Sequence, residues 1–574
     1  MIFFYIFLYR IVRYNKNEID YIVYFRIIYE VIIINIFLQK TMLFSILLCL
    51  YLTLFVSPSS ANEKTYIING TITTDDSRQP HDDIKTIENY NTWWNHYTDY
   101  ANGYSINYPI NMNVDVSLSP IRTLFTNEQT TIEVYYDNFT NTASNAHDYI
   151  HYGNRFTDNT KDHSIERDET FFKNNYKVHL LKWTRRHLSK VPNDKNYYVS
   201  GEIIKNSNEV YTIFIKSNQP IENELDIINS FTAFNPQGTP YMNKPYGHSK
   251  TLMNPETKAF WQKYFAPTST LQWGVFEPSA PEVMRYLTTL EEKLDSKFSF
   301  ILRYQTLDEA LPLYGLQKAY ENHNYVELTL QTIRPGLANA LSGNHQDPNA
   351  SVIYDILDGH YDDYLHEYAK QLKTFGHPII FRLNNEMNGD WCWYSAYYTG
   401  KDAELYKALW IYIHTIFNEH DVDNVIWVWN PHDVSRPDFK WNHYMTYYPG
   451  DEYVDVIGLT GYNTGTYFPG EQWRDFNQIY DPLYNEYLGL FPKPFMISEF
   501  GSNSVGGNKV QWINTMFDSI KKYDNIKVAI WWSGIDYDKN GIPGRIYLID
   551  EDEEVSNAFR SRLKEYKPME EKTK

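Results

Sequence analysis

The C-terminal part of the sequence predicts an α/β fold, namely a closed (β/α)8 TIM barrel. Eight apolar runs of strand length follow one another over residues 256–574. The runs are nearly continuous in apolar residues, which is typical of parallel strands that are buried on both faces. Eight such units, alternating with helical segments, favour a closed barrel over an open doubly wound sheet. The predicted strands begin near Leu271, Phe298, Tyr325, Pro378, Asn424, Val454, Pro494 and Ile526.

The segments between these runs have the periodicity of amphipathic helices. In one of them, Leu405, Ala408 and Leu409 recur at i, i+3 and i+4, and Ile413 continues the same face. This spacing places the four side chains on one side of a helix, where they can cover the sheet. The predicted helices are 282–294, 353–375, 404–417, 473–488 and 509–523.

A smaller N-terminal α+β domain is predicted over residues 85–234. Short runs of alternating apolar and polar residues lie between turn residues, which is typical of strands in antiparallel sheets. Polar, Pro-rich and Gly-rich stretches flank this domain and are predicted to be linkers, at 62–84 and 235–255. Strands are predicted at 104–108, 131–136, 197–204 and 210–215, and a basic, partly helical segment at 177–191.

Residues 1–61 predict an upstream stretch followed by a signal peptide. The run 43–56 is apolar and uncharged, but it is shorter than the ~20 residues that a membrane-spanning helix needs. It has the length of a signal-peptide core and precedes small residues that predict cleavage after Ala61. Because such a core normally lies close to the start of a protein, Met42 is the expected start of translation. The chain is therefore expected to be secreted or extracellular, with a membrane-anchored N-terminus as the alternative.

Composition excludes several classes of function. With 52 Lys and Arg against 71 Asp and Glu, the net charge is −19, which is unfavourable for binding nucleic acid. Two cysteines cannot build a disulfide framework or a cysteine-rich metal site. No metal, no other cofactor and no obligate protein partner is expected. The 15 Trp and 51 Tyr residues offer flat apolar faces with polar edges, which suit the ring of a sugar.

Two glutamates follow predicted strands of the barrel at the end where active sites form. Glu386 follows the fourth strand, and Glu499 lies at the end of the seventh. Hydrolysis of a glycosidic bond uses two carboxyl groups that flank the bond, one as an acid and one as a nucleophile or base. The pair Glu386 and Glu499 is therefore the predicted catalytic pair.

The sequences around both glutamates resemble those of clan A retaining glycoside hydrolases, and within the clan they are most similar to family 26, the β-mannanase family. The stretch Asn385-Glu386-Met387-Asn388-Gly389-Asp390-Trp391 carries one half of the resemblance, and Ile497-Ser498-Glu499-Phe500-Gly501 carries the other. The resemblance implies that Glu386 is the acid/base and Glu499 the nucleophile of a double-displacement reaction. Family 26 usually has His before the acid/base, and Asn385 at this position makes the specificity for mannan less secure.

Six further residues are expected to bind substrate or to support the two glutamates. Asn385 is expected to hydrogen-bond the 2-OH of the sugar, and Tyr462 to orient the carboxylate of Glu499. Trp531 is expected to be the platform on which the reacting sugar stacks. The others are Trp391 and Trp429, which are expected to contact substrate, and Arg382, which is expected either to hold a carboxylate of the site or to form a structural ion pair.

The leading hypothesis is a secreted retaining endo-β-glycosidase that hydrolyses β-1,4-mannan-type polysaccharide. The same mechanism acting on another β-glucan or on xylan is a close alternative, because loop residues set the substrate. A non-catalytic carbohydrate-binding surface protein that kept the barrel is an alternative from another class. The presence of both Glu386 and Glu499 argues against that alternative, since a binding protein needs neither.

Overall fold

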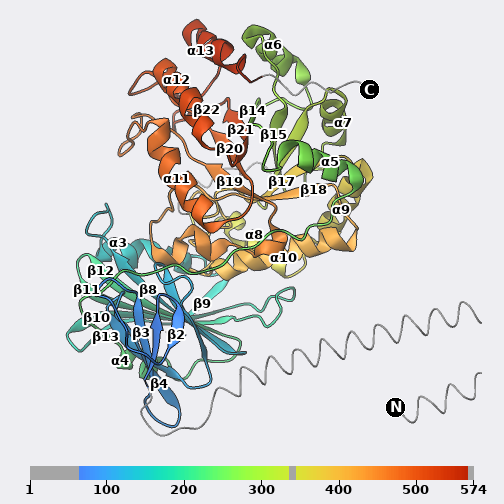
Figure 1. Ribbon diagram of the computed structural model, residues 1–574. Helices are drawn as coiled ribbons and strands as arrows, with labels where there is room; N and C mark the ends of the chain where they lie inside the picture. The colour runs from blue at the N-terminus through green and yellow to red at the C-terminus, as the bar shows by residue number, and fades with distance from the viewer. Residues whose placement is uncertain (1–63, 335–343, 567–574) are drawn as a thin grey trace, which may run out of the picture. The chain divides into compact units, whose positions relative to one another are not determined.

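Eight parallel strands form a closed barrel in the computed structural model, which describes residues 64–334 and 344–566. Helices lie around these strands (Figure 1). The strands pair in chain order, and β14 closes the barrel by pairing with β21. The barrel strands are β14 (Gln272–Phe276), β15 (Phe300–Thr306), β16 (Tyr325–Gln331), β17 (Ile379–Leu383), β18 (Val425–Trp429), β19 (Val456–Thr460), β20 (Phe495–Phe500) and β21 (Ile526–Trp532). The predicted barrel is confirmed, and each strand begins within two residues of its predicted start.

The helices of this part follow the predicted segments with one break. The segment 353–375 is not one helix but two, because the chain turns at Gly359, which has a φ of +89° that side-chain-bearing residues rarely adopt. The helices are α5 (Pro255–Tyr264), α6 (Met284–Leu294), α7 (Leu313–Glu321), α8 (Val352–Leu357), α9 (Asp362–Phe375), α10 (Ala403–Glu419), α11 (Phe476–Leu490), α12 (Lys509–Ser519) and α13 (Glu553–Leu563), and a hairpin of β22 (Ile535–Tyr537) and β23 (Pro543–Ile546) follows β21.

Alternate side chains of the barrel strands pack into two different cores. Ile380, Ile426 and Ile530 belong to a cluster inside the barrel. Their strand neighbours Phe381 and Trp427 belong to a larger cluster that includes residues of the surrounding helices. This alternation is the ordinary consequence of the two-residue period of a strand, and it decides which side chains near the strand ends can reach a ligand.

Two antiparallel sheets make up the N-terminal part, here called the β-region (residues 65–233). The segment predicted to be partly helical, 177–191, is instead largely strand β10, and part of the predicted linker 62–84 forms β1 and β2. One sheet has the order β13-β5-β4-β3-β1-β2 and the other β6-β7-β8-β12-β11-β10-β9. Their elements are β1 (Thr65–Ile68), β2 (Thr71–Thr73), β3 (Ile84–Asn89), β4 (Trp94–Asp99), β5 (Tyr104–Pro109), β6 (Asn113–Asp115), β7 (Arg122–Thr126), β8 (Thr130–Asn138), β9 (His163–Lys173), β10 (Tyr176–Arg185), β11 (Tyr197–Asn206), β12 (Glu209–Ser217) and β13 (Thr232–Ala233), with the short helices α3 (Ala146–Gly153) and α4 (Glu224–Ser230).

The β-region and the barrel belong to the same compact unit, which begins at Lys64. One hydrophobic cluster contains Tyr149, Phe156 and Trp183 of the β-region together with Trp441 and other residues of the barrel. His163 of β9 also hydrogen-bonds the hydroxyl of Tyr354 in α8, at 2.8 Å. The two parts therefore share a core, although they share no sheet.

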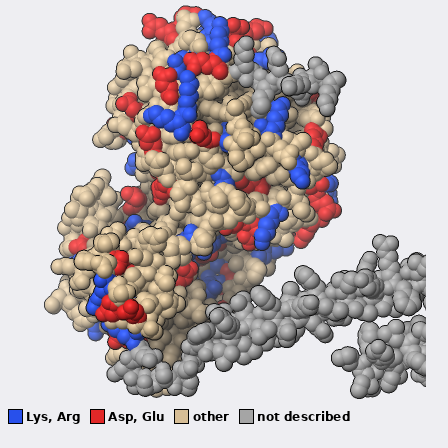
Figure 2. Space-filling view, in the orientation of Figure 1, with Lys and Arg blue, Asp and Glu red and all other residues tan. Residues whose placement is uncertain are grey.

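The predicted signal peptide or anchor lies outside the described residues. Within the part of the chain that the structure describes, no helix has both the length and the apolar character needed to span a bilayer. Acidic and basic side chains are interspersed on the face of the molecule in Figure 2, where the described basic residues form no continuous patch.

Candidate active site

Glu386 and Glu499 lie at the carboxyl ends of two strands of the same barrel. Glu386 is the third residue after β17, and Glu499 is the next-to-last residue of β20. The strands β18 and β19 separate β17 from β20 in the barrel. Carboxyl ends of parallel barrel strands meet at one face, which is where the active sites of such barrels form.

Arg382 connects the two glutamates through a short chain of hydrogen bonds. Its guanidinium donates from Nη2 to Oε2 of Glu499 at 3.1 Å and from Nη1 to Oδ1 of Asn430 at 2.8 Å. The backbone carbonyl of Asn430 in turn accepts the N–H of Glu386, at 2.7 Å. Arg382 is fully buried, so its charge is compensated within the protein. The sequence left open whether Arg382 holds a carboxylate of the site, and the structure places it against Glu499.

A second carboxylate shares Arg382. Glu327 of β16 lies 2.8 Å from Nε of Arg382 and is fully buried. Burial raises the pKa of Glu327 to about 7, and the charge of Arg382 acts against this rise. Removing one partner from such a buried pair leaves an uncompensated charge and typically costs about 3–5 kcal/mol. Arg382 therefore links Glu499 to a second buried carboxyl group on the barrel wall.

Glu499 is buried and receives two hydrogen bonds on the same oxygen. Tyr304, two residues before the end of β15, donates its hydroxyl to Oε2, the oxygen that Arg382 also binds. No hydrogen bond among the described residues is made to Oε1 of Glu499, which leaves that oxygen available to a substrate. Burial, with a smaller contribution from the charge of Asp536, raises the pKa of Glu499 to about 8. The two donors favour the charged form and so act against this rise.

Glu386 lies in a different environment. Its φ is +54°, and that of Asn384 is +52°, a left-handed conformation that is uncommon for residues other than Gly, Asn and Asp and that is found repeatedly at functional sites. The side chain is 12% exposed, and Oε1 lies 3.9 Å from Nε2 of His432. The indole N–H of Trp391 donates to Oε2 at 2.9 Å. Trp391 therefore lies in the candidate site and is in direct contact with the predicted acid/base.

Asn385 and Tyr462 also lie close to this group. Asn385 is buried, and its Oδ1 accepts a hydrogen bond from Gln331 at 3.0 Å. No hydrogen bond among the described residues uses the amide NH2 of Asn385. Burial and the charges of Glu386 and Asp536 raise the pKa of Tyr462. The hydroxyl that donates to Glu499 is that of Tyr304, so the role expected of Tyr462 falls to a different tyrosine.

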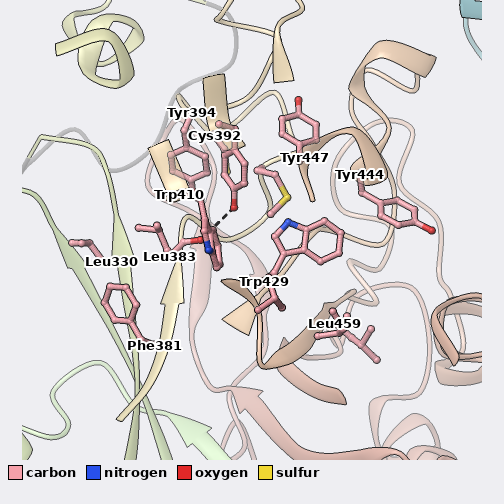
Figure 3. Packing of buried hydrophobic residues seen from close by; sticks show 14 of the residues in the cluster. Leu330, Phe381, Leu383, Cys392, Tyr394, Trp410, Trp429, Tyr444, Tyr447 and Leu459 are labelled. Atoms are coloured by element: carbon pink, nitrogen blue, oxygen red, sulfur yellow. Dashed lines mark hydrogen bonds between the residues drawn. The ribbon is translucent and has the colours of Figure 1, made fainter. Parts of the chain in front are cut away.

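For two residues, the predicted role in substrate binding is wrong. Trp531 and Trp429 are both fully buried and belong to the cluster that packs against the helices. Trp531 packs against Phe559 of α13 with ring centroids 4.8 Å apart, and its N–H donates to a backbone carbonyl. Figure 3 shows Trp429 among other core side chains, including Tyr444 and Leu459. The error has a simple cause, because alternate residues of a strand face opposite sides.

Trp532, the residue after Trp531, lies on the inner side of the barrel, where Trp531 was expected to lie. Trp532 is partly exposed and packs on the cluster inside the barrel. Its ring stacks on Phe276 with centroids 5.3 Å apart and meets Tyr462 edge to face. Trp532, Tyr304 and Glu327 are residues of the candidate site that sequence reasoning missed. Trp532 is the last residue of β21 and Tyr304 lies two residues before the end of β15, so reading the last residues of every strand for aromatic side chains would have found these two.

Within residues 64–334 and 344–566, no group of three or more His, Cys, Asp or Glu side chains has an arrangement that could hold a metal ion. The arrangement described above consists of two carboxyl groups, a guanidinium and aromatic residues, which is a set suited to acid–base and nucleophilic chemistry on a neutral substrate.

Comparison with known proteins gives a consistent result. Residues 344–532, which include both glutamates, match glycosyl hydrolase family 26. The chain is 35% identical over 182 residues to endoglucanase H of Acetivibrio thermocellus, which is 31% of this chain and 20% of that protein. It is 34% identical over 144 residues to a mannan endo-1,4-beta-mannosidase of Bacillus subtilis, which is 24% of this chain and 34% of that protein. The chain thus matches about a fifth to a third of the length of these relatives.

Among solved structures, the catalytic domain of a Bacillus sp. JAMB-750 GH26 endo-beta-1,4-mannanase is similar at 20% identity with a TM-score of 0.41. This match covers 56% of the chain and 93% of that structure. At this level of similarity, the fold is established by the strand order of the barrel itself. The residues that match the family span β17 to β21 and include Glu386, Glu499 and Arg382. The part of the barrel that carries both glutamates is thus similar to glycosyl hydrolase family 26.

Proposed function

We propose that the chain is a retaining endo-β-glycosidase that hydrolyses β-1,4-mannan-type polysaccharide. The observation that carries the proposal is the pair Glu386 and Glu499, joined through Asn430 and Arg382 at the carboxyl face of the barrel. The different environments of the two carboxyl groups match the two roles that a double displacement needs.

Glu499 has the features of the nucleophile. Its Oε2 is held by Arg382 and Tyr304, which support the negative charge, and Oε1 is free to attack. In the first step Oε1 bonds to the anomeric carbon while the glycosidic C–O bond breaks. Glu386 gives its proton to the departing oxygen, so that the leaving sugar departs as a neutral alcohol.

Glu386 then acts as a base in the second step. Its carboxylate takes a proton from a water molecule, the water oxygen bonds to the anomeric carbon, and the bond to Glu499 breaks. Glu499 is regenerated as a carboxylate and Glu386 as an acid, and the two inversions give net retention. Trp391, which hydrogen-bonds Glu386, and the aromatic group of Trp532 and Phe276 supply surfaces against which sugar rings can pack.

A β-glucan is the second candidate substrate. Two observations favour it: the relative named endoglucanase H is 35% identical over 182 residues, and Asn385 replaces the usual His before the acid/base. Residues on loops set the substrate of such barrels, so a change of substrate would leave the mechanism as proposed.

The test is the release of reducing sugar from mannan, glucomannan, lichenan and xylan by the purified protein. Wild type is compared with Glu386→Ala and Glu499→Ala, each with its thermal unfolding measured. Cleavage of mannan that both substitutions abolish supports the proposal. Cleavage of lichenan without mannan keeps the mechanism and replaces the substrate, whereas binding to a polysaccharide with no release by wild type contradicts an enzymatic role.

Secretion is part of the proposal and rests on the apolar run 43–56 with small residues before the expected cleavage after Ala61. Expression of the full sequence in a secreting host tests it. Protein in the medium that begins at Asn62 supports secretion, and protein that remains in the membrane fraction with residues 1–61 attached supports the anchor instead.

A further inference from the structure

The loop between β17 and α10 (residues 384–402) carries Glu386 and lies largely buried. All of its residues are buried except Glu386, Asp390 and Trp391. Lys401 and Asp402 at its end are 2% and 3% exposed, so their charges need partners inside the protein. The loop has no helix or strand of its own, and its conformation therefore depends on what it packs against.

The β-region supplies the partners of the two buried charges. Lys401 forms an ion pair with Glu202 of β11. Asp402 accepts a hydrogen bond from the hydroxyl of Tyr198 at 2.9 Å and lies 2.9 Å from Nζ of Lys216. The C-terminal end of the loop is thus held by side chains that belong to the other part of the molecule.

The β-region also reaches the part of the loop next to Glu386. The hydroxyl of Tyr152, in α3, donates to Oδ2 of Asp390 at 2.6 Å, and its ring stacks on Tyr397 with centroids 4.8 Å apart. Asp390 is adjacent to Trp391, whose N–H binds Oε2 of Glu386 at 2.9 Å. A continuous path therefore runs from α3 through Asp390 and Trp391 to the carboxyl group of the acid/base.

We propose that Tyr152 is a positioning residue for Glu386: by binding Asp390 it fixes Trp391, and Trp391 fixes the carboxyl group that protonates the leaving oxygen. This inference rests on the proposed function, because it assigns Glu386 the role of acid. If Tyr152 has this role, the β-region helps to position the acid/base. Tyr152 does not touch the reacting atoms and acts only through Asp390 and Trp391.

A property of acid catalysis separates this role from a merely structural one. A sugar leaving group needs a proton from Glu386, whereas a 2,4-dinitrophenolate leaves without one because it is already a stable anion. A change that misplaces the acid therefore lowers kcat/KM for an oligosaccharide and leaves kcat/KM for the dinitrophenyl glycoside nearly unchanged. A change that merely loosens the fold lowers both together.

The experiment uses the full chain and two substrates built on the same sugar: an oligosaccharide of the polysaccharide that wild type cleaves, and the 2,4-dinitrophenyl glycoside of its disaccharide. Tyr152→Phe removes the hydroxyl and keeps the ring that stacks on Tyr397. Tyr198→Phe is the matched control, because it removes a buried hydroxyl that binds the same loop at its far end. Thermal unfolding is recorded for each variant.

We expect Tyr152→Phe to lower kcat/KM for the oligosaccharide about tenfold, a part of the ~10²–10⁴-fold that an acid catalyst contributes, and for the dinitrophenyl glycoside less than twofold. Tyr198→Phe should lower the unfolding temperature, and its effect on kcat/KM should be the same for the two substrates. Asp390→Ala, which removes the acceptor, should separate the substrates as Tyr152→Phe does.

Equal losses on both substrates in Tyr152→Phe, or the same separation in Tyr198→Phe, would overturn the positioning role. Glu386→Ala keeps that result distinct from a failure of the proposed function. If Glu386→Ala separates the substrates and Tyr152→Phe does not, only the role of Tyr152 is lost. If Glu386→Ala itself fails to separate them, the role of Glu386 as acid is lost as well.

Discussion

The carboxyl ends of β17 and β20 each present a glutamate, but the two surroundings differ. Glu499 belongs to a strand, is buried and is bound by a guanidinium and a phenol. Glu386 belongs to a loop, has a left-handed backbone and is bound by the neutral indole of Trp391. The comparison teaches how neighbours can give the same side chain two tasks: under the proposed function, Glu499 is the charged nucleophile and Glu386 is the acid that loses and regains its proton.

The largest effect is expected from removing the carboxyl group of Glu499, which the guanidinium of Arg382 binds. Glu499→Ala should reduce hydrolysis of the polysaccharide by at least about 10⁴-fold, since losing a nucleophile costs on the order of 10⁶-fold where it has been measured in other hydrolases. Reducing-sugar release measures the loss. A variant that keeps more than a tenth of wild-type activity would remove Glu499 from the mechanism.

Removing the carboxyl group of Glu386, on the loop after β17, should lower activity less, and by an amount that depends on the substrate. Glu386→Ala should lower kcat/KM for an oligosaccharide by about 10²–10⁴-fold, and much less for an activated aryl glycoside. Steady-state kinetics on the two substrates measures the difference. If Glu386→Ala and Glu499→Ala respond alike to the leaving group, the division of roles described above is wrong.

Trp531 and Trp532 at the end of β21 face opposite sides of the strand, which gives a third prediction. Trp532→Ala should raise KM about tenfold, because an aromatic contact contributes about 0.5–1.5 kcal/mol beyond the area that it buries. Trp531→Phe, one residue earlier, should lower the unfolding temperature and leave KM unchanged, because Trp531 packs against α12 and α13. The opposite pattern would mean that Trp531 faces the substrate after all.

The donors to Glu499 predict a change in pH dependence. Glu499 must be ionised to attack, and its pKa is raised to about 8, so kcat/KM should rise with pH through this range. Tyr304 donates to the charged form and so lowers the pKa. Tyr304→Phe should therefore move the acidic limb of the profile upward, by about one pH unit for a hydrogen bond to a charged group. A limb that stays in place or moves down contradicts this arrangement.

The smallest expected effect is on stability. The pKa of Glu499 is raised to about 8 in the folded protein, against about 4.3 in an unfolded chain. Between these values the folded state retains a proton that the unfolded state has released, so wild-type stability falls as pH rises. Glu499→Gln cannot ionise and should unfold a few degrees higher than wild type at pH 8, with little difference at pH 4. A scanning calorimetry series that shows no such trend contradicts the assigned pKa.

The barrel strands and the positions of the two glutamates could be predicted from the sequence. The eight barrel strands were predicted within two residues of their starts, because strands buried on both faces have a continuous apolar signal. The two glutamates followed from the strand ends. The sequence could not say which of Trp531 and Trp532 faces inward, since a run of apolar residues hides the alternation that decides it. Nor could it predict that Tyr152 meets Asp390, because that contact joins residues that are far apart in the chain.

The most direct test of the account is to trap the covalent intermediate. A 2-deoxy-2-fluoro glycoside of the substrate sugar with a dinitrophenolate leaving group slows both steps, and the good leaving group allows the first step to occur. Peptide mass mapping of the inactivated protein should find one fluorosugar, bound to Glu499. A label on Glu386 or on another residue, or an active enzyme that takes up no label, would contradict the roles given to the two glutamates.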